Sequence, residues 1–142
     1  MHKIAILAVV LFCLISSCIG DRYYTLLTIK NNANKDIYFS RSNLYPDTSI
    51  NLGIYIPKSA PATPSEIIHQ GESLPVIIRS TVTLDKYFAD NVPSNTLEVF
   101  IYDVSVVKTT PWDSVVAKYL ILKRYDLTVD SLKKLNGVIT YP

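Results

Sequence analysis

The chain has 142 residues with a formal net charge of +2, and 49% of its residues are hydrophobic while 18% are charged. This near-neutral balance excludes the strongly basic composition typical of nucleic-acid-binding proteins, so no nucleic-acid partner is expected. The apolar content excludes a disordered chain, and the length suits one domain with its own core.

The first 17 residues have the pattern of a signal peptide. Lys3 gives a basic start, and an unbroken apolar run follows at residues 4–15. A helix of this run, rising about 1.5 Å per residue, is too short to cross a hydrocarbon core of about 30 Å. We therefore expect residues 1–17 to be removed as a signal peptide and not to remain as a membrane span.

The residues after the apolar run predict attachment of a lipid. Ile15, Ser16, Ser17 and Cys18 resemble the bacterial lipobox, although leucine usually fills the place of Ile15. The resemblance implies that the Cys18 thiol is acylated, for example with palmitate, and that Cys18 becomes the mature N-terminus. Cleavage after Gly20 by ordinary signal peptidase is the alternative, with small residues at 18 and 20.

Lipidation would leave the mature chain without a free thiol. The other cysteine, Cys13, lies in the apolar run and would be discarded with it. Neither cysteine is then available for a disulfide or a metal site. The predicted organisation is a signal peptide at 1–17, a lipidated tether at 18–22 and one β-rich domain at 23–142.

Strand-like patterns recur along the predicted domain. An Asn-rich loop between the first two predicts a hairpin, and a Gln-Gly turn joins the fourth to the fifth, where Pro75 indicates an edge strand. Alternation is clearest in the sixth, which places Leu97, Val99 and Ile101 on one side and Glu98, Phe100 and Tyr102 on the other. The expected strands are residues 24–30, 37–40, 49–56, 66–69, 74–78, 97–102, 120–125 and 138–141.

Three short helices are expected between strands. Thr83 and Thr128 are capping residues for two of them, which end near residues 91 and 136. The third begins at Thr110-Pro111, and its apolar face predicts a buried Trp112 that packs with Val115, Val116 and Tyr119. The expected fold is mainly β, an antiparallel β-sandwich of Ig-like or Greek-key type with two or three short helices in connections.

Several segments resemble a family of small lipoproteins of gut Bacteroidetes. The resemblance covers residues 28–142, and its most specific parts are the Arg-Tyr-Asp-Leu-Thr element at 124–128 and the C-terminal Ile-Thr-Tyr-Pro. Gly137 departs from the family pattern, in which an Asn-Trp pair is more usual. The resemblance implies a cell-envelope lipoprotein. It supplies no catalytic residues, because the family has no assigned activity.

Residues that commonly carry chemistry are few. Only His69 remains after processing, in a turn beside Gln70-Gly71, so neither a zinc site nor a cofactor is expected and no catalytic residue is assigned. Asp130 falls in the first turn of a helix, which explains it without paired-acid chemistry with Asp126. Arg124 is expected to pair with an acid across the sheet. The ten tyrosines suit both strands and carbohydrate binding.

These patterns favour a non-catalytic lipoprotein of the bacterial cell envelope, anchored to the outer membrane through Cys18. It would act as a membrane-proximal binding or assembly module for a protein or a glycan. The alternative is a hydrolase or transferase that acts on envelope polymers, with His69 or a carboxylate pair as the base.

Overall fold

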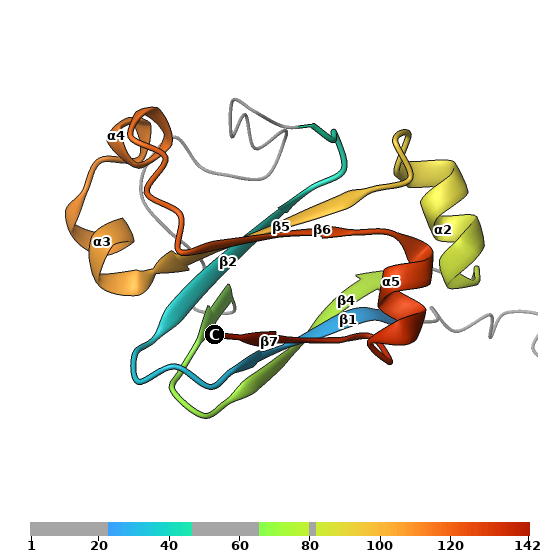
Figure 1. Ribbon diagram of the computed structural model, residues 1–142, viewed down its shortest axis with the longest axis horizontal. Helices are drawn as coiled ribbons and strands as arrows, with labels where there is room; N and C mark the ends of the chain where they lie inside the picture. The colour runs from blue at the N-terminus through green and yellow to red at the C-terminus, as the bar shows by residue number, and fades with distance from the viewer. Residues whose placement is uncertain (1–22, 47–65, 80–81) are drawn as a thin grey trace, which may run out of the picture.

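A computed structural model describes residues 23–46, 66–79 and 82–142, and these residues form a β-sandwich with short helices (Figure 1). The predicted fold class is confirmed. The strands are β1 (Tyr23–Asn31), β2 (Ile37–Ser42), β3 (Ile67–Ile68), β4 (Ser73–Arg79), β5 (Leu97–Asp103), β6 (Lys123–Leu127) and β7 (Val138–Tyr141). The helices are α2 (Leu84–Asn91), α3 (Val104–Thr109), α4 (Trp112–Ala117) and α5 (Val129–Lys134).

Two sheets pack against each other, one with the strand order β4-β1-β7 and one with the order β3-β2-β5-β6. Neighbouring strands are antiparallel except β1 and β7, which run parallel from Thr28 and Val138 onward. Helix α5 lies between β6 and β7 and carries the chain from the four-stranded sheet to the three-stranded one. Pro75 lies on the edge strand β4, as predicted, where its missing N–H costs no ladder bond.

The predicted hairpin between the first two strands is wrong. β1 pairs with β4 while β2 pairs with β3, so the Asn-rich loop carries the chain from one sheet to the other, and the turn at Gln70-Gly71 carries it back. The two bends lie side by side (Figure 1, lower left), where Asn31 N–H donates to Glu72 O at 2.9 Å and Gly71 N–H donates to Asn31 O at 2.9 Å. Gly71 has φ +78°, which an L side chain rarely adopts.

A buried amide holds this corner together. The Asn31 side chain has no exposed surface, and its Nδ2 donates to Lys35 O at 2.8 Å and to Ile68 O at 3.0 Å. Its Oδ1 accepts from Ala33 N–H at 3.0 Å. The side chain thus satisfies backbone groups of both bends, which buried carbonyls require.

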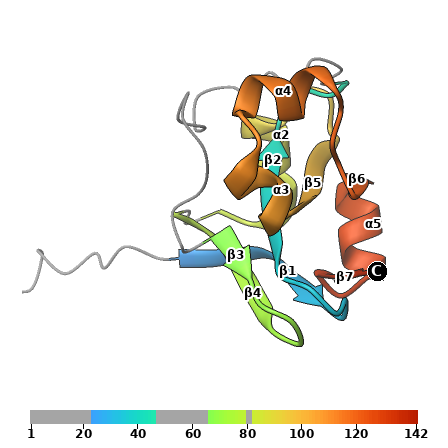
Figure 2. The ribbon, with the colours of Figure 1, turned by 90° about the vertical axis from the view of Figure 1, so that its left-hand side faces the viewer.

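Strand β5 is buried on both faces. Leu97, Val99 and Ile101 point into the core between the sheets, as the alternation predicts. Phe100 and Tyr102 belong to a second core on the outer face, which α3 and α4 cover (Figure 2). That second core consists of Tyr38, Phe100, Tyr102, Val104, Val107 and Val115.

Helix α4 differs from its prediction at both ends. It begins at Trp112, with Pro111 at the cap, and ends at Ala117. Trp112 is only partly buried, at the edge of the second core, and its ring lies 5.5 Å from the Tyr102 ring. Tyr119 does not share the buried face, because φ of +50° ends the helix there and leaves its side chain 48% exposed.

The other two predicted helices are confirmed, and one helix was not predicted. Thr83 and Thr128 cap α2 and α5 with their side chains. The unpredicted α3 begins where Asp103 accepts from Ser105 N–H at 2.8 Å. The valines after Asp103 favour a strand by propensity, but the cap and the second core they cover favour a helix.

The predicted strand at 120–125 is shifted toward the C-terminus, because Leu120 N–H still bonds to Val115 O and the β6 ladder begins only at Lys123. The expected strand at 49–56, the leader and the tether with Cys18 lie outside the described residues. Among the residues described, no helix has the length and apolar character needed to span a membrane.

Candidate binding surface around Arg124

The most distinctive polar cluster of the described residues lies on the outer face of the four-stranded sheet. Arg124 and Asp126 are two residues apart in β6, so their side chains share one face. The register sets Arg124 opposite Phe100 and Asp126 opposite Glu98, both of which point to that face from β5. Three charged side chains from two adjacent strands therefore meet beyond the area that α3 and α4 cover.

Glu98 is the buried member of the cluster. Its side chain has no exposed surface, and its Oε1 lies 2.6 Å from Arg124 Nη2. Its other strand neighbour, Ser42, is also buried. A carboxylate at such a site is retained only when a cation or hydrogen bonds compensate its lost hydration. Arg124 supplies that cation.

Arg124 is held in one orientation by several partners. Its Nε donates to Asp126 Oδ1 at 2.7 Å, and its Nη2 lies 3.3 Å from Asp126 Oδ2. Its guanidinium lies 5.6 Å from the centre of the Tyr45 ring and 5.9 Å from that of Phe100. The hydrogen bond to Asp126, with smaller contributions from Tyr119 and Glu98, raises the pKa of Arg124. One cation and two carboxylates leave the cluster with a formal charge of −1.

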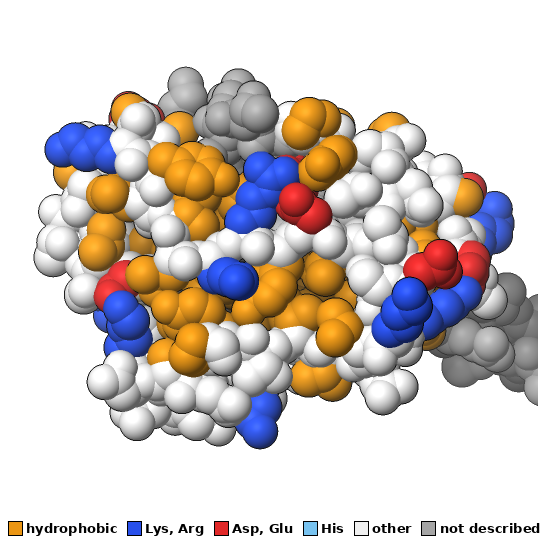
Figure 3. Space-filling view, in the orientation of Figure 1, with side chains coloured by type: hydrophobic (Ala, Val, Ile, Leu, Met, Phe, Trp, Pro, Cys, Tyr) orange, Lys and Arg blue, Asp and Glu red, His pale blue; other side chains and the backbone are white. Residues whose placement is uncertain are grey.

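Exposed apolar side chains surround this cluster. Tyr45 is 39% exposed and Tyr119 48%, and the aliphatic residues Leu44 and Leu122 are also exposed. Figure 3 shows basic and acidic side chains adjoining one another above a wide apolar area of the molecular surface. We call Tyr45, Tyr119, Arg124 and Asp126, with Glu98 beneath them, the Arg124 surface. It offers aromatic faces beside fixed hydrogen-bonding groups.

His69 lies elsewhere, at the exposed turn that the sequence predicts. Its Nδ1 lies 2.9 Å from Asp36 Oδ2, and its side chain is 62% exposed. Asp36 Oδ1 also accepts from Gln70 N–H at 3.2 Å. The hydrogen bond to Asp36 raises the pKa of His69. In the described ranges no serine, threonine or cysteine forms a hydrogen bond with this imidazole, so it has no nucleophile there to activate.

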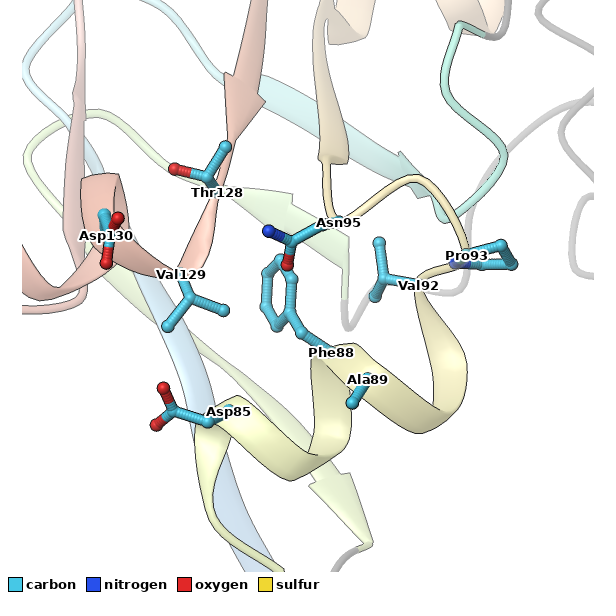
Figure 4. Close-up of a pocket in the computed structure, with 9 residues that line it drawn as sticks. All are labelled: Asp85, Phe88, Ala89, Val92, Pro93, Asn95, Thr128, Val129 and Asp130. Carbon is cyan, nitrogen blue, oxygen red and sulfur yellow. The ribbon is translucent and has the colours of Figure 1, made fainter.

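A groove lies between α2 and α5 and is lined in part by titratable residues. It has a cavity volume of about 410 Å³. Figure 4 shows Phe88 of α2 directed toward Val129 at the start of α5. Asp85 and Asp130 lie at its rim, and Asp85 is paired with Lys133 at 2.7 Å. Its polar lining comes from the starts of the two helices and from Asn95, which follows α2.

The predicted acids do not form a catalytic pair. Asp126 is bound to Arg124, while Asp130 lines the groove at the start of α5. Arg124 pairs across the sheet, as predicted, and also with Asp126 on its own strand. In the described parts of the chain, no three His, Cys, Asp or Glu side chains gather as metal ligands would.

The sequence prediction missed Glu98 and Tyr45 as site residues. A lone acid within the apolar run Leu-Glu-Val-Phe-Ile-Tyr is a usable signal, because a charge at a buried strand position requires a partner. Tyr45 gave no such signal in its turn. Comparison of the chain with known protein families, with curated proteins and with solved structures finds no match.

Proposed function

We propose that this chain is a lipid-anchored module of the bacterial cell envelope that binds a glycan at the Arg124 surface without catalysing a reaction. The observation that carries the binding proposal is the fixed guanidinium of Arg124 beneath the Tyr45 ring, held by Glu98 and Asp126. The sequence pattern around Cys18 supports the anchor.

A sugar ring matches this chemistry in two ways. Its apolar face packs on an exposed tyrosine ring, and its hydroxyl groups both donate and accept hydrogen bonds. Tyr45 and Tyr119 provide partly exposed rings, while Asp126 accepts and Arg124 donates. Because the Arg124 side chain is already ordered, binding would cost little further conformational entropy.

Glycan binding is tested with the purified domain and a printed panel of bacterial envelope glycans, followed by calorimetry on any glycan retained. Tyr45→Ala and Tyr119→Ala should each weaken binding about tenfold, which corresponds to about 1.4 kcal/mol. Tyr23→Ala is the matched control, since Tyr23 is 68% exposed on the other sheet. Unchanged affinity in both Arg124-surface variants, or no glycan retained, would refute glycan binding there.

The anchor is tested separately by growing cells with a clickable fatty-acid analogue. The wild-type chain should incorporate the label and Cys18→Ser should not. Cys13→Ser is the matched control, because it removes the other thiol of the leader region and should leave labelling intact. Labelling that persists in Cys18→Ser would show that the lipid attachment is assigned to the wrong residue.

The enzyme alternative would use the His69–Asp36 pair as a base. That pair is exposed, with the His69 side chain 62% and the Asp36 side chain 42% accessible, so water screens the interaction. We therefore assign no catalytic role to it. His69→Ala should leave glycan binding unchanged and should complement a deletion of the gene as well as the wild type does. A folded His69→Ala protein that fails to complement the deletion would favour the enzyme alternative.

A further inference from the structure

We infer that the outer face of the three-stranded sheet, at the Tyr23 end of β1, rests on the headgroup region of the phospholipid bilayer that holds the anchor. This orientation depends on the proposed acylation of Cys18. It goes beyond that proposal because it assigns the side of the sandwich that faces lipid.

The large exposed apolar side chains of the described residues fall into two groups. One group consists of Tyr45 and Tyr119, which belong to the Arg124 surface, and of Leu44 and Leu122 beside them. The other belongs to the three-stranded sheet and the turn that leads into β7, and its exposed fractions are Tyr23 68%, Tyr24 39%, Ile77 54%, Leu135 46% and Val138 40%. The second group is unrelated to the Arg124 surface and needs another explanation.

Strand register places members of this second group on one face. Ile77 lies opposite Thr25, and Thr28 lies between Pro75 and Val138. Their neighbours along the strands, such as Val76 and Ile139, are buried in the core between the sheets. Alternation therefore directs Ile77 and Val138 outward. The helices α3 and α4 cover the other sheet (Figure 2).

The occupant of this face follows from where β1 begins. Only residues 18–22 separate the proposed lipid from Tyr23, and five residues at about 3.5 Å each reach less than about 18 Å. The start of β1 is thus held within that distance of the acyl chains. Tyr23, on the same outer face as Ile77, is suited to this depth, since tyrosine places an apolar ring and a polar hydroxyl at the membrane–water boundary, whereas Tyr24 lies opposite the buried Ile78 and is directed to the other face.

Basic side chains accompany these tyrosines. Lys133 of α5 lies near Tyr24 and pairs with Asp85 at 2.7 Å. Lys134 is exposed in the same turn of α5. Lysines at these positions can keep their ammonium groups among lipid phosphates while their carbon chains cover apolar surface.

This orientation points the Arg124 surface away from the bilayer. The two sheets form opposite layers of the sandwich, and the Arg124 surface lies on the outer face of the layer that is farther from the tether. A glycan of the envelope could then be bound without competition from lipid.

The test uses the full lipid-anchored chain in vesicles of phosphatidylcholine with a minor fraction of phosphatidylglycerol. Single cysteines carry a fluorophore at Ile77→Cys on the proposed lipid face or at Tyr119→Cys on the opposite layer. Nitroxide-labelled phospholipid should quench the fluorophore at residue 77 at least threefold more strongly than that at residue 119. Equal quenching, or stronger quenching at residue 119, overturns the orientation.

A matched pair of charge substitutions gives a second measurement. With the fluorophore at Val138→Cys, Ile77→Asp should at least halve the quenching, whereas Leu44→Asp should leave it unchanged. The two sites suit the comparison because their side chains are 54% and 60% exposed. Equal effects of both substitutions refute the assignment of this face to lipid.

The lipid content of the same preparation separates the two levels of the proposal. A chain whose Cys18 carries no lipid by mass spectrometry refutes the anchor itself. A lipidated chain with equal quenching on both layers refutes only the orientation.

Discussion

Arg124 Nη2 lies 2.6 Å from Glu98 Oε1, and the Glu98 side chain has no exposed surface. The pair joins β5 to the edge strand β6. In this register Arg124 lies opposite Phe100, and Asp126, two residues farther along β6, lies opposite Glu98. Burying an ion pair rarely adds net stability over apolar residues of similar size, but breaking one is costly. We therefore regard the pair as a device that fixes where the guanidinium lies.

Removing the arginine should destabilise the domain strongly. We expect Arg124→Met to lower the free energy of unfolding by about 3 kcal/mol, because Glu98 loses its cation in a dry environment. The measurement is urea denaturation followed by circular dichroism. Lys123→Met, at the exposed neighbouring position, is the control and should change stability by no more than about 0.5 kcal/mol.

The double variant Glu98→Gln, Arg124→Met, together with the two single variants, completes a double-mutant cycle. It should be more stable than Arg124→Met alone, because the buried charge is removed together with its partner. A double variant whose loss equals the sum of the two single losses would show that the charges are not coupled.

Replacing the buried amide of Asn31 should open the corner between the sheets. Asn31→Ala removes the hydrogen bonds to Lys35 O, Ile68 O and Ala33 N–H, and we expect a loss of about 2–3 kcal/mol. Thermal denaturation measures it. Asn32→Ala is the matched control, since Asn32 is the exposed next residue in the same loop. Similar melting temperatures for both variants would show that the amide is dispensable.

Trp112 should contribute less than a fully buried tryptophan. Its ring packs edge-on against Tyr102 but remains partly accessible. We therefore expect Trp112→Ala to lower the free energy of unfolding by about 2–3 kcal/mol, whereas removing a core aromatic typically costs about 3–5 kcal/mol. Urea denaturation of this variant and of Asp113→Ala, its exposed neighbour, makes the comparison. Equal stability of the two variants would show that the Trp112 ring does not stabilise the second core.

Acid should weaken the cap of α3. Hydrogen bonds from Ser105, with help from Lys35, lower the pKa of Asp103 to about 2. Because the pKa is lower in the folded state, the stabilisation is complete above the unfolded value near 3.9 and is lost as the pH falls toward 2. The stability difference between wild type and Asp103→Asn should thus shrink over this range, from about 2 kcal/mol at neutral pH. A difference that stays constant down to pH 2 would contradict the assignment.

His69 should titrate above its ordinary value. NMR of its ring protons should give a pKa above 6.5, because Asp36 accepts a hydrogen bond from it. Any stabilisation by this pair is present below pH 6.5 and disappears as the pH rises through the folded pKa. Asp36→Asn should lower the pKa of His69 more than Glu72→Gln does. A larger effect of Glu72 would mean that another geometry prevails in solution.

Local patterns were sufficient to predict most elements of this fold. Alternation in residues 97–102 predicted both faces of β5, and capping threonines predicted the starts of α2 and α5. The failures in strand pairing involve partners that are distant along the chain. Residues 24–30 and 37–40 have the local features of a hairpin, yet their strands pair with β4 and with β3 and β5.

The Arg124 surface could likewise be predicted only in part from local sequence. An acid partner for Arg124 was expected from its place in a strand, whereas the identity of Glu98 depends on the pairing of β5 with β6. The aromatic neighbour Tyr45 belongs to a turn after β2, and only the folded chain brings its ring over the guanidinium.

The bends at Asn31 and Gly71 carry two adjacent chain segments from one sheet into the other. Melting the three-stranded sheet would release β1 and β4. It would therefore also pull on β2, which follows β1, and on β3, which precedes β4. The layers therefore cannot act as independent cooperative units. Calorimetry should record one transition, with the calorimetric enthalpy equal to the van't Hoff enthalpy.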